Sequence, residues 1–368
     1  MLLWQIILLV VGMILLIKGA DFFVEGSSKI AKALHIPSLI IGLTLVSMGT
    51  SAPELSVSIN AALSGSNDLS LGNVVGSNTF NTFLILGASS IVVPLIIGDD
   101  MRKYDIPIMV GIYGLFLIFG FLITPYQLDR IESIIFLVIF VAYMVLLFFR
   151  AKKGGDEEEA TEDQPLTIKN IVLSVLIAVA GVLTILGFNT IAVIVIAIFT
   201  VLMILKFTKP VNEKSKALNI ILSLIFTGAG LVAIIGGGTL VVDSASYIAQ
   251  ELGMSEALVG LTIVAVGTSL PELVTSIVAS IKKENDIAIG NVIGSNIFNV
   301  LLILGTTSTI KPLALSSDAL FDLIVLFVSG LLVLIISLCG KNMKKWQGAL
   351  FVLCYVAYLA FIIIRNYA

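Results

Sequence analysis

Long apolar runs follow one another along almost the whole chain, and each is close to the length of a membrane-crossing helix. An α-helix needs about 20 apolar residues to cross a hydrocarbon core about 30 Å thick. A segment in lipid must also pair its backbone groups internally, as a helix does. The sequence therefore predicts an all-α integral membrane protein in a lipid bilayer. The expected spans are residues 3–24, 39–63, 70–96, 106–123, 131–149, 171–187, 191–205, 217–242, 257–281, 287–309, 319–338 and 349–364.

The composition of the 368 residues excludes several other classes of protein. Hydrophobic residues make up 58% of the chain and charged residues 12%, against about 45–50% and about 25% in soluble domains. The net charge of −3 offers no basic surface for nucleic acid. The chain has a single histidine, and neither an HExxH motif nor a Ser/His arrangement can be found in it. We expect neither an enzyme nor a bound cofactor.

A long internal repeat divides the chain into two related halves. Residues 71–87 read LGNVVGSNTFNTFLILG and residues 289–305 read IGNVIGSNIFNVLLILG, so that 12 of 17 positions are identical. The same offset of 218 residues, without a gap, aligns GTSAPEL at 49–55 with GTSLPEL at 267–273. Repeats of this kind are typical of secondary transporters, whereas a channel usually needs a pore with rotational symmetry across subunits.

The distribution of positive charge predicts that the two halves are inserted in opposite directions. Most of the 21 Lys and Arg residues fall in alternate connections between the spans, and connections rich in them face the cytoplasm. Both chain ends are then outside. The connection after the first span is cytoplasmic, whereas its counterpart after residue 242 has no Lys or Arg and is external. The pattern predicts two inverted five-helix repeats.

Three regions follow from this repeat. We expect residues 1–150 to form the first five-span repeat, 151–216 an acidic cytoplasmic linker with an extra helical hairpin or a shorter packing element, and 217–368 the second, inverted repeat. The acidic run at 156–163 could be a regulatory Ca²⁺ site, but its spacing does not fit an EF-hand loop. Runs of like charge are usually solvated connectors, and we interpret this one in that way.

Two glutamates, Glu54 and Glu272, lie at matching positions inside otherwise apolar spans. A charged carboxylate at that depth is costly and by default marks an ion pathway; the alternative is a protonated, hydrogen-bonded side chain. The proline before each glutamate removes a backbone donor, so we expect the helices to open and free carbonyl oxygens near Gly49 and Gly267. Oxygen-bearing side chains recur around them at helical spacing: Ser47, Thr50 and Ser51; Thr268 and Ser269; Asn73, Ser77 and Asn81; and Asn291, Ser295 and Asn299.

The chemistry of this set of side chains favours hard cations, because all of the available ligand atoms are oxygens. Ca²⁺ takes six to eight oxygen ligands in flexible geometry. Two carboxylates carry a charge that matches one Ca²⁺ or two Na⁺ ions. An empty site would leave two like charges together in low dielectric, so the pattern favours exchange of ions over one-way passage.

The paired motifs GTS-x-PE and GN-V-x-GSN-x-FN resemble the α-repeats of the Ca²⁺/cation antiporter superfamily, specifically those of its prokaryotic sodium/calcium exchangers. The resemblance covers both halves of the chain, over residues 5–150 and 217–366. It implies that Glu54 and Glu272 are central carboxylates shared by Ca²⁺ and Na⁺. The other implied ligands are backbone carbonyls of Ser47, Thr50, Ala265 and Thr268, hydroxyls of Ser51, Ser77, Ser269 and Ser295 at flanking Na⁺ sites, and the central amide of Asn81.

Position 299 bears on the choice of ions. Several relatives carry Asp where this chain has Asn299, and in the K⁺-dependent branch of the superfamily that acid is associated with K⁺. Asn at both 81 and 299 is more similar to the K⁺-independent exchangers.

We therefore expect a monomeric secondary antiporter in the plasma membrane that exchanges Na⁺ for Ca²⁺ by alternating access, independently of K⁺. The alternative is an antiporter of Ca²⁺, or of another divalent cation, against H⁺, in which the same carboxylates carry protons. The glycine-rich first spans of the two halves, around 12–19 and 230–238, are expected to slide past an ion-binding core.

Overall fold

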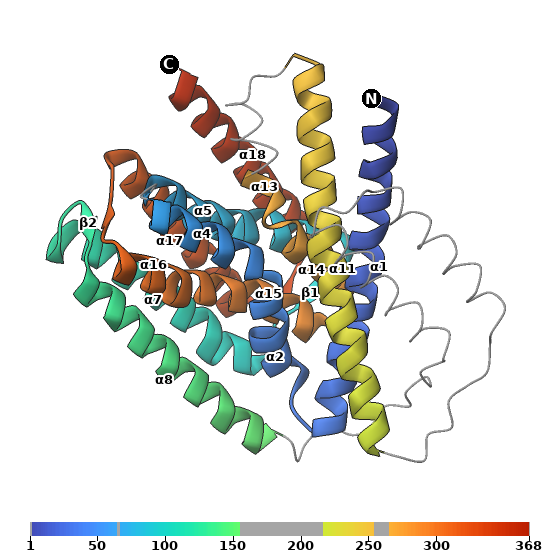
Figure 1. Cartoon of the computed structure of the whole chain (residues 1–368). Helices are drawn as coiled ribbons and strands as arrows, with labels where there is room; N and C mark the ends of the chain where they lie inside the picture. Colours follow the sequence, from blue (N-terminus) through green and yellow to red (C-terminus); the bar gives the residue numbers. More distant parts are fainter. Residues whose placement is uncertain (1, 65–66, 155–215, 254–264, 368) are drawn as a thin grey trace.

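The computed structural model describes residues 2–64, 67–154, 216–253 and 265–367 of the chain (Figure 1). The acidic linker and the extra hairpin expected at 171–187 and 191–205 lie outside these residues. Everything below concerns the described part.

Helices account for nearly all of the described first half. Their ends lie within a few residues of the predicted spans, with two exceptions: α1 runs to Leu34, whereas the predicted span ended at residue 24, and the end of α6 is discussed below. The elements are α1 (Leu2–Leu34), α2 (Ser38–Ile41), η1 (Gly42–Val46), α3 (Ser47–Thr50), α4 (Ala52–Ser64), α5 (Asn67–Phe80), η2 (Asn81–Ile85), α6 (Leu86–Val92), η3 (Met101–Asp105), α7 (Ile106–Ile118), η4 (Phe119–Ile123) and α8 (Arg130–Gly154).

The described second half repeats this order. Its first helix is longer than predicted and runs to Glu251. The elements are α11 (Lys216–Glu251), α13 (Ala265–Gly267), α14 (Leu270–Ile281), α15 (Asn285–Phe298), η6 (Asn299–Leu304), α16 (Gly305–Ile310), α17 (Ser317–Cys339) and α18 (Lys345–Tyr367).

Seven helices in the described ranges are long and apolar enough to cross a membrane, and the pair Ser38–Thr50 and Ala52–Leu63, bent by 48°, would make eight. The segments Asn67–Val92 and Leu270–Ile281 are less apolar or shorter, and both carry the polar residues of the repeated motifs. In an apolar stretch of 18 residues within the segment Asn285–Ile310, 94% of the residues are buried within the protein, whereas in the equivalent stretch of Lys345–Arg365 only 11% are. The motif-bearing helices therefore form the centre of the bundle, and α18 lies at its outside.

The first helices of the two halves, α1 and α11, lie side by side and antiparallel (Figure 1). A Cβ atom added to Gly12 would lie 3.0 Å from the carbonyl of Gly237, and one added to Gly19 would lie 2.9 Å from the carbonyl of Gly230. Small residues at such a contact let two backbones approach closely. The antiparallel packing shows directly that the second half is inverted relative to the first.

Two short antiparallel sheets connect the halves to each other. Strand β1 (Leu95–Ile96) pairs with β4 (Asn342–Met343), and β2 (Gln127–Leu128) pairs with β3 (Leu313–Ala314). Strands β1 and β3 occupy equivalent places in the two halves, as do β2 and β4, so exchanging the halves exchanges the two sheets. The predicted all-α fold of two inverted five-helix repeats is confirmed, with these four two-residue strands as its only strands in the described ranges.

Strand β1 also corrects one predicted span. Residues 70–96 were expected to be one helix, but α6 ends at Val92. Val93 is extended, with φ −138° and ψ 127°, because the residue before a proline, here Pro94, is disfavoured in helical geometry.

The helices α1 and α11 end in the same way. His35, the residue after α1, has φ 53°, and the Ile36 N–H donates to the Ala31 carbonyl at 2.9 Å. Its counterpart in the second half is Gly253, with φ 91°. A left-handed residue that closes the last turn of a helix is usually glycine, so the only histidine of the chain has a structural role at a helix end.

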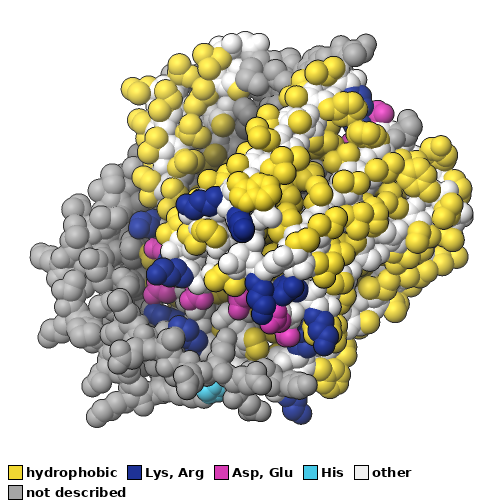
Figure 2. All heavy atoms as spheres, turned by 180° about the vertical axis from the view of Figure 1, so that it is seen from behind, with side chains coloured by type: hydrophobic (Ala, Val, Ile, Leu, Met, Phe, Trp, Pro, Cys, Tyr) yellow, Lys and Arg dark blue, Asp and Glu magenta, His cyan; other side chains and the backbone are white. Residues whose placement is uncertain are grey.

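Charged side chains gather in a band across one part of the surface, and hydrophobic side chains cover much of the rest (Figure 2). Asp99, after β1, accepts hydrogen bonds from Lys341 at 2.8 Å and Arg102 at 3.1 Å. These two cations hold the pKa of Asp99 below its ordinary value, Lys341 most of all. A Cβ added to the neighbouring Gly98 would lie 3.9 Å from Asp286 Oδ1. We call the end of the bundle that carries Lys29, Arg102, Lys282 and Lys341 the basic end.

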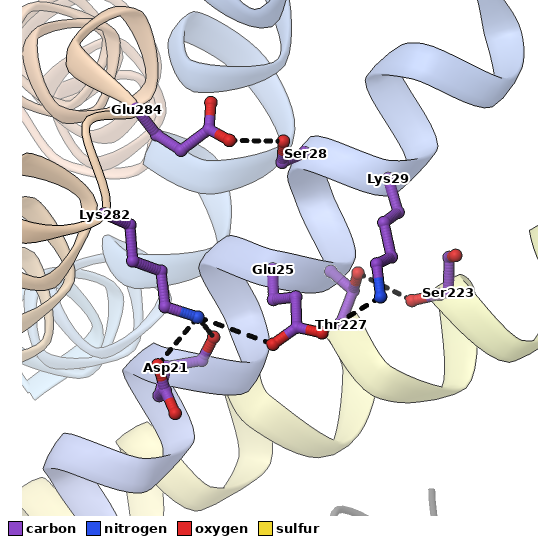
Figure 3. Close-up of polar contacts among 8 residues, drawn as sticks. All are labelled: Asp21, Glu25, Ser28, Lys29, Ser223, Thr227, Lys282 and Glu284. Carbon is purple, nitrogen blue, oxygen red and sulfur yellow. Dashed lines mark hydrogen bonds and ion pairs between the residues drawn. The ribbon is translucent and has the colours of Figure 1, made fainter. Parts of the chain in front are cut away.

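Polar contacts join α1 to the turn between α14 and α15 at the basic end (Figure 3). The ammonium of Lys282 lies 2.7 Å from Asp21 Oδ1 and 3.5 Å from Glu25 Oε2. Ser28 Oγ donates to Glu284 Oε1 at 2.7 Å. The α1–α11 pair is therefore fastened to the rest of the bundle at this end by two ion pairs and a hydrogen bond.

Candidate cation-binding site

The second helical segment of each half is broken beside its glutamate. Helix α3 ends at Thr50 and α4 begins at Ala52, with φ −83° and ψ 9° at Ser51 between them. In the second half α13 ends at Gly267 and α14 begins at Leu270. Proline lacks an N–H group and cannot continue the hydrogen-bonding pattern of the preceding turn. The predicted openings are confirmed, at positions closer to the prolines than expected.

The two breaks bring the glutamates together across the repeat. Ser51 Oγ donates to Glu272 Oε1 at 2.9 Å, and Ser269 Oγ donates to Glu54 Oε1 at 3.0 Å. Both carboxylates are 0% exposed. Each serine thus serves the glutamate of the opposite half, and the site exists only because the two halves meet.

The first asparagine of each GN motif fixes the backbone around these carboxylates. Asn73 Nδ2 donates to Ser58 Oγ at 2.9 Å and to the Glu54 carbonyl at 3.2 Å. Asn291 makes the equivalent bond to Ser276 Oγ at 2.9 Å. These asparagines connect α5 to α4 and α15 to α14, so their amide nitrogens act as anchors of the site.

The threonines of the two breaks also reach across the repeat. Thr50 Oγ1 donates to Asn291 Oδ1 at 3.0 Å, and Thr268 Oγ1 donates to Asn73 Oδ1 at 3.4 Å. The hydroxyl stripe that the sequence placed on one helical face therefore points into the other half.

Several buried polar atoms at this centre have no hydrogen-bond partner in the described part of the chain. They are Glu54 Oε2, Glu272 Oε2, Ser77 Oγ, Asn81 Oδ1, Asn81 Nδ2 and Asn299 Oδ1. An unsatisfied buried polar atom costs about 1–3 kcal/mol, and such atoms call for a bound partner. All but one are oxygens, and two belong to carboxylates, so the set fits a cation with oxygen ligands.

The remaining predicted residues lie on the same four segments. Ser295 Oγ is 3.4 Å from the carbonyl of Ser47, to which it donates. The Ser47 hydroxyl donates to the Leu43 carbonyl at 2.8 Å within its own helix. Ala265 is the first residue of α13. The predicted residues are therefore brought to one region, in which some hydroxyls are already used by the protein.

Two further asparagines were missed as functional candidates in the sequence. Asn78 and Asn296 are both 0% exposed and bond to each other's segments at the centre of the bundle. The signal that could have found them is the repeated GSN triplet, in which they are the third residue.

The number of carboxylates limits what the site can hold. The described residues contain no group of three or more His, Cys, Asp or Glu side chains that could hold a metal ion. Two carboxylates surrounded by neutral oxygens can neutralise a small cation without enclosing it in a highly charged cage. Such a site suits an ion that must bind and leave again.

The chain is similar to known exchangers over nearly its whole length. The family described as sodium/calcium exchanger protein matches residues 4–149 and 222–364. The sodium/calcium exchanger MaX1 of Methanosarcina acetivorans is 32% identical over an alignment 374 positions long, gaps included, which covers 96% of this chain and 97% of MaX1. The inner membrane protein YrbG of Escherichia coli is 32% identical over an alignment 333 positions long, which covers 88% of this chain and 87% of YrbG.

A solved structure supports the same assignment. The sodium-calcium exchanger NCX_Mj, soaked with 10 mM Na⁺ and zero Ca²⁺, matches with a TM-score of 0.75 and 27% identity, over 98% of this chain and 99% of that one. The expected resemblance to prokaryotic sodium/calcium exchangers is confirmed. The chain therefore belongs to the sodium/calcium exchanger protein family, and it is a multi-pass membrane transporter of the Ca²⁺/cation antiporter superfamily and not an enzyme.

Proposed function

We propose that this protein exchanges Na⁺ for Ca²⁺ by alternating access, without K⁺, through a site centred on Glu54 and Glu272. The observation that supports this most strongly is that each of the two fully buried carboxylates keeps one oxygen without a hydrogen-bond partner among the described residues. A pair of carboxylates in low dielectric needs a cation or a proton nearby. The neutral oxygens around them add ligands but no charge, which suits one Ca²⁺ or two Na⁺ ions.

We assign the ligands as the sequence motifs imply. Glu54 and Glu272 would bind both ions in turn. The supporting ligands would be the carbonyls of Ser47, Thr50, Ala265 and Thr268, the hydroxyls of Ser51, Ser77, Ser269 and Ser295, and the amides of Asn81 and Asn299. In this structure the hydroxyls of Ser51 and Ser269 donate hydrogen bonds to the carboxylates. In the presence of a bound cation they would turn their oxygens toward it.

We place the basic end in the cytoplasm, because connections rich in Lys and Arg face inward. A monomer in the plasma membrane then has both chain ends outside, with a first repeat at 1–150, a linker region at 151–216 and an inverted repeat at 217–368. The glycine-packed pair of α1 and α11 would slide past the motif-bearing core to open the site to either side.

H⁺ is the second candidate for the coupling ion, with Ca²⁺ or another divalent cation as the ion exchanged. The unpartnered oxygen of each buried carboxylate could accept a proton as well as a cation. Under this alternative, Glu54 and Glu272 would return across the membrane protonated.

The decisive experiment is Ca²⁺ uptake into liposomes that contain the purified protein. Uptake is measured under an outward Na⁺ gradient, an outward H⁺ gradient and no gradient, each with and without K⁺. We expect uptake under the Na⁺ gradient alone, unchanged by K⁺. Uptake driven only by H⁺ would replace the proposal with its alternative.

Substitution of the carboxylates tests the site itself. Glu54→Gln and Glu272→Gln should abolish uptake, because each removes a charge but keeps the shape of the side chain. Glu132→Gln is the matched control. Glu132 is also buried (2% exposed), and one of its oxygens also has no partner among the described residues, but it lies at the start of α8, outside the repeated motifs. Its other oxygen accepts a hydrogen bond from the Asp129 N–H, as glutamine can. Full uptake in either site variant would refute the assignment.

A further inference from the structure

A chain of hydrogen bonds joins the two halves behind the candidate site. Asn78 Nδ2 donates to the Asn296 carbonyl at 3.0 Å, and Asn296 Nδ2 donates to Thr82 Oγ1 at 2.9 Å. Thr82 Oγ1 donates in turn to the Asn78 carbonyl at 2.8 Å. The chain ends at the site, where Asn299 Nδ2 donates to Asn78 Oδ1 at 2.9 Å. All four side chains are 0% exposed.

These bonds determine which way each amide points. A backbone carbonyl can only accept, so Asn78 must turn its Nδ2 toward the Asn296 carbonyl and its Oδ1 away from it. That oxygen can only accept as well, so Asn299 must turn its Nδ2 toward Asn78. The Oδ1 atom of Asn299 is thereby directed away from the chain of bonds, and it has no partner in the described residues.

The symmetry-related set of bonds, with the roles of the two halves exchanged, does not form among the described residues. The 218-residue offset relates Asn78 to Asn296, Asn81 to Asn299 and Thr82 to Val300. The equivalent bond would join Asn81 Nδ2 to Asn296 Oδ1, but neither atom has a partner in the described part of the chain. The amide of Asn296 is instead oriented by the Thr82 hydroxyl, which Val300 cannot offer to Asn78. A single Thr/Val difference between the halves therefore accompanies the loss of symmetry.

We propose that Asn78, whose Nδ2 is held by the Asn296 carbonyl, is a positioning residue that holds the Asn299 oxygen toward the transported ion. Thr82 supports this contact from both sides, because its hydroxyl accepts from the Asn296 side chain and donates to the Asn78 carbonyl. Asn299 is then a fixed oxygen ligand, whereas the amide of Asn81 has no hydrogen bond within the described residues that fixes its orientation. This inference rests on the proposed function and adds to it that the two halves of the site are unequal. An oxygen held in place loses no rotational freedom when Ca²⁺ binds, and residues that hold metal ligands typically contribute about 10–100-fold in affinity.

The test compares substitutions on one helical segment, and its decisive pair, Thr82→Val and Thr79→Val, nearly keeps the side-chain volume. Thr82→Val removes the hydroxyl that orients Asn296, and Thr82→Ser keeps it. Thr79→Val is the matched control, because Thr79 is also 0% exposed but its hydroxyl donates to the Val75 carbonyl of its own helix, at 2.8 Å. Asn78→Ala removes the positioning residue itself.

Equilibrium Ca²⁺ binding to the purified protein and the KM and kcat of uptake are measured for each variant. We expect Asn78→Ala and Thr82→Val to weaken Ca²⁺ binding and raise KM about 10-fold, with less than a twofold change in kcat. Thr82→Ser and Thr79→Val should match the unsubstituted protein.

Equal Ca²⁺ affinity in Thr82→Val and Thr79→Val would overturn the proposal, and this pair decides the matter should Asn78→Ala fail to fold. Because binding is measured without a gradient, the result is independent of the coupling ion. If the protein bound Ca²⁺ but showed no Na⁺-driven uptake, the proposed function would be refuted. The comparison of Ca²⁺ affinity between Thr82→Val and Thr79→Val would still be valid.

Discussion

Replacing Lys282 by glutamine should loosen the contact between α1 and the core at the basic end. The Lys282 ammonium lies 2.7 Å from Asp21 Oδ1, 2.9 Å from the Asp21 carbonyl and 3.5 Å from Glu25 Oε2 (Figure 3). If α1 slides past the core during transport, these contacts must break whenever the site opens at this end. Glutamine retains most of the side-chain volume but no charge.

The free-energy effect of Lys282→Gln follows from how exposed the two ion pairs are. The side chains of Lys282, Asp21 and Glu25 are 26%, 34% and 31% exposed, so solvent screens them strongly. Pairs of this kind are worth about 0.2–1 kcal/mol each, and the two together about 0.4–2 kcal/mol. Since about 1.4 kcal/mol is a factor of ten, the open population at the basic end should rise about 2- to 30-fold.

The effect should be confined to the basic end. The positions related to Lys282, Asp21 and Glu25 by the repeat are Ser64, Thr239 and Asp243. They offer no cation, so the opposite end cannot form the same ion pairs. The protein should therefore favour the conformation that is closed at the basic end.

Thiol labelling measures this opening directly. Ser27 is 0% exposed and precedes Ser28, which bonds to Glu284, so Ser27→Cys should react with a maleimide only when α1 separates from the core. The two native cysteines, Cys339 and Cys354, are replaced by serine. We expect Lys282→Gln to raise the labelling rate about 2- to 30-fold. High concentrations of the chloride salt of an organic cation screen the ion pairs and should also raise the labelling rate of the parent protein.

The control for this experiment lies in the same turn. Lys283 is exposed and makes none of the contacts described for Lys282, so Lys283→Gln changes the net charge equally and should leave the labelling rate unchanged. Equal rates in Lys282→Gln and Lys283→Gln would show that the ion pairs do not restrain α1, and the reasoning would fail.

Three further outcomes are expected. Arg150→Ala should cost about 3–5 kcal/mol of stability, because it leaves the fully buried carboxylate of Asp105, to which Arg150 donates at 2.7 Å, without its counter-ion. Arg365→Ala should cost clearly less, because its partner carboxylate is 17% exposed. Equal shifts of the melting temperature in the two variants would contradict this. His35→Gly should raise stability by about 0.5–1 kcal/mol, since glycine adopts the left-handed geometry without strain, so a lower melting temperature would count against it. Asn299→Asp should make Ca²⁺ uptake sensitive to K⁺, and identical uptake with and without K⁺ would disprove that role.

Much of this protein could be predicted from local features of its sequence. The length and apolarity of the runs determine a helical membrane protein, because lipid admits few alternatives. The 218-residue offset identifies two homologous halves, and Glu54 and Glu272 stand out because a carboxylate is rare at that depth. The prolines next to them correctly predict that the helices open there.

Only the tertiary structure decided which polar groups meet. Helical spacing placed Ser51 on the same face as Glu54, yet its hydroxyl bonds to Glu272, 221 residues away. The same holds for Asn299, whose amide is oriented by Asn78 across 221 residues. Spacing along one helix describes neighbours within that helix, whereas a hydrogen bond between inverted halves depends on how the halves pack. The sequence by itself determined the membrane fold, its symmetry and its two central charges; the unequal surroundings of Asn81 and Asn299 arise only when the two halves are folded against each other.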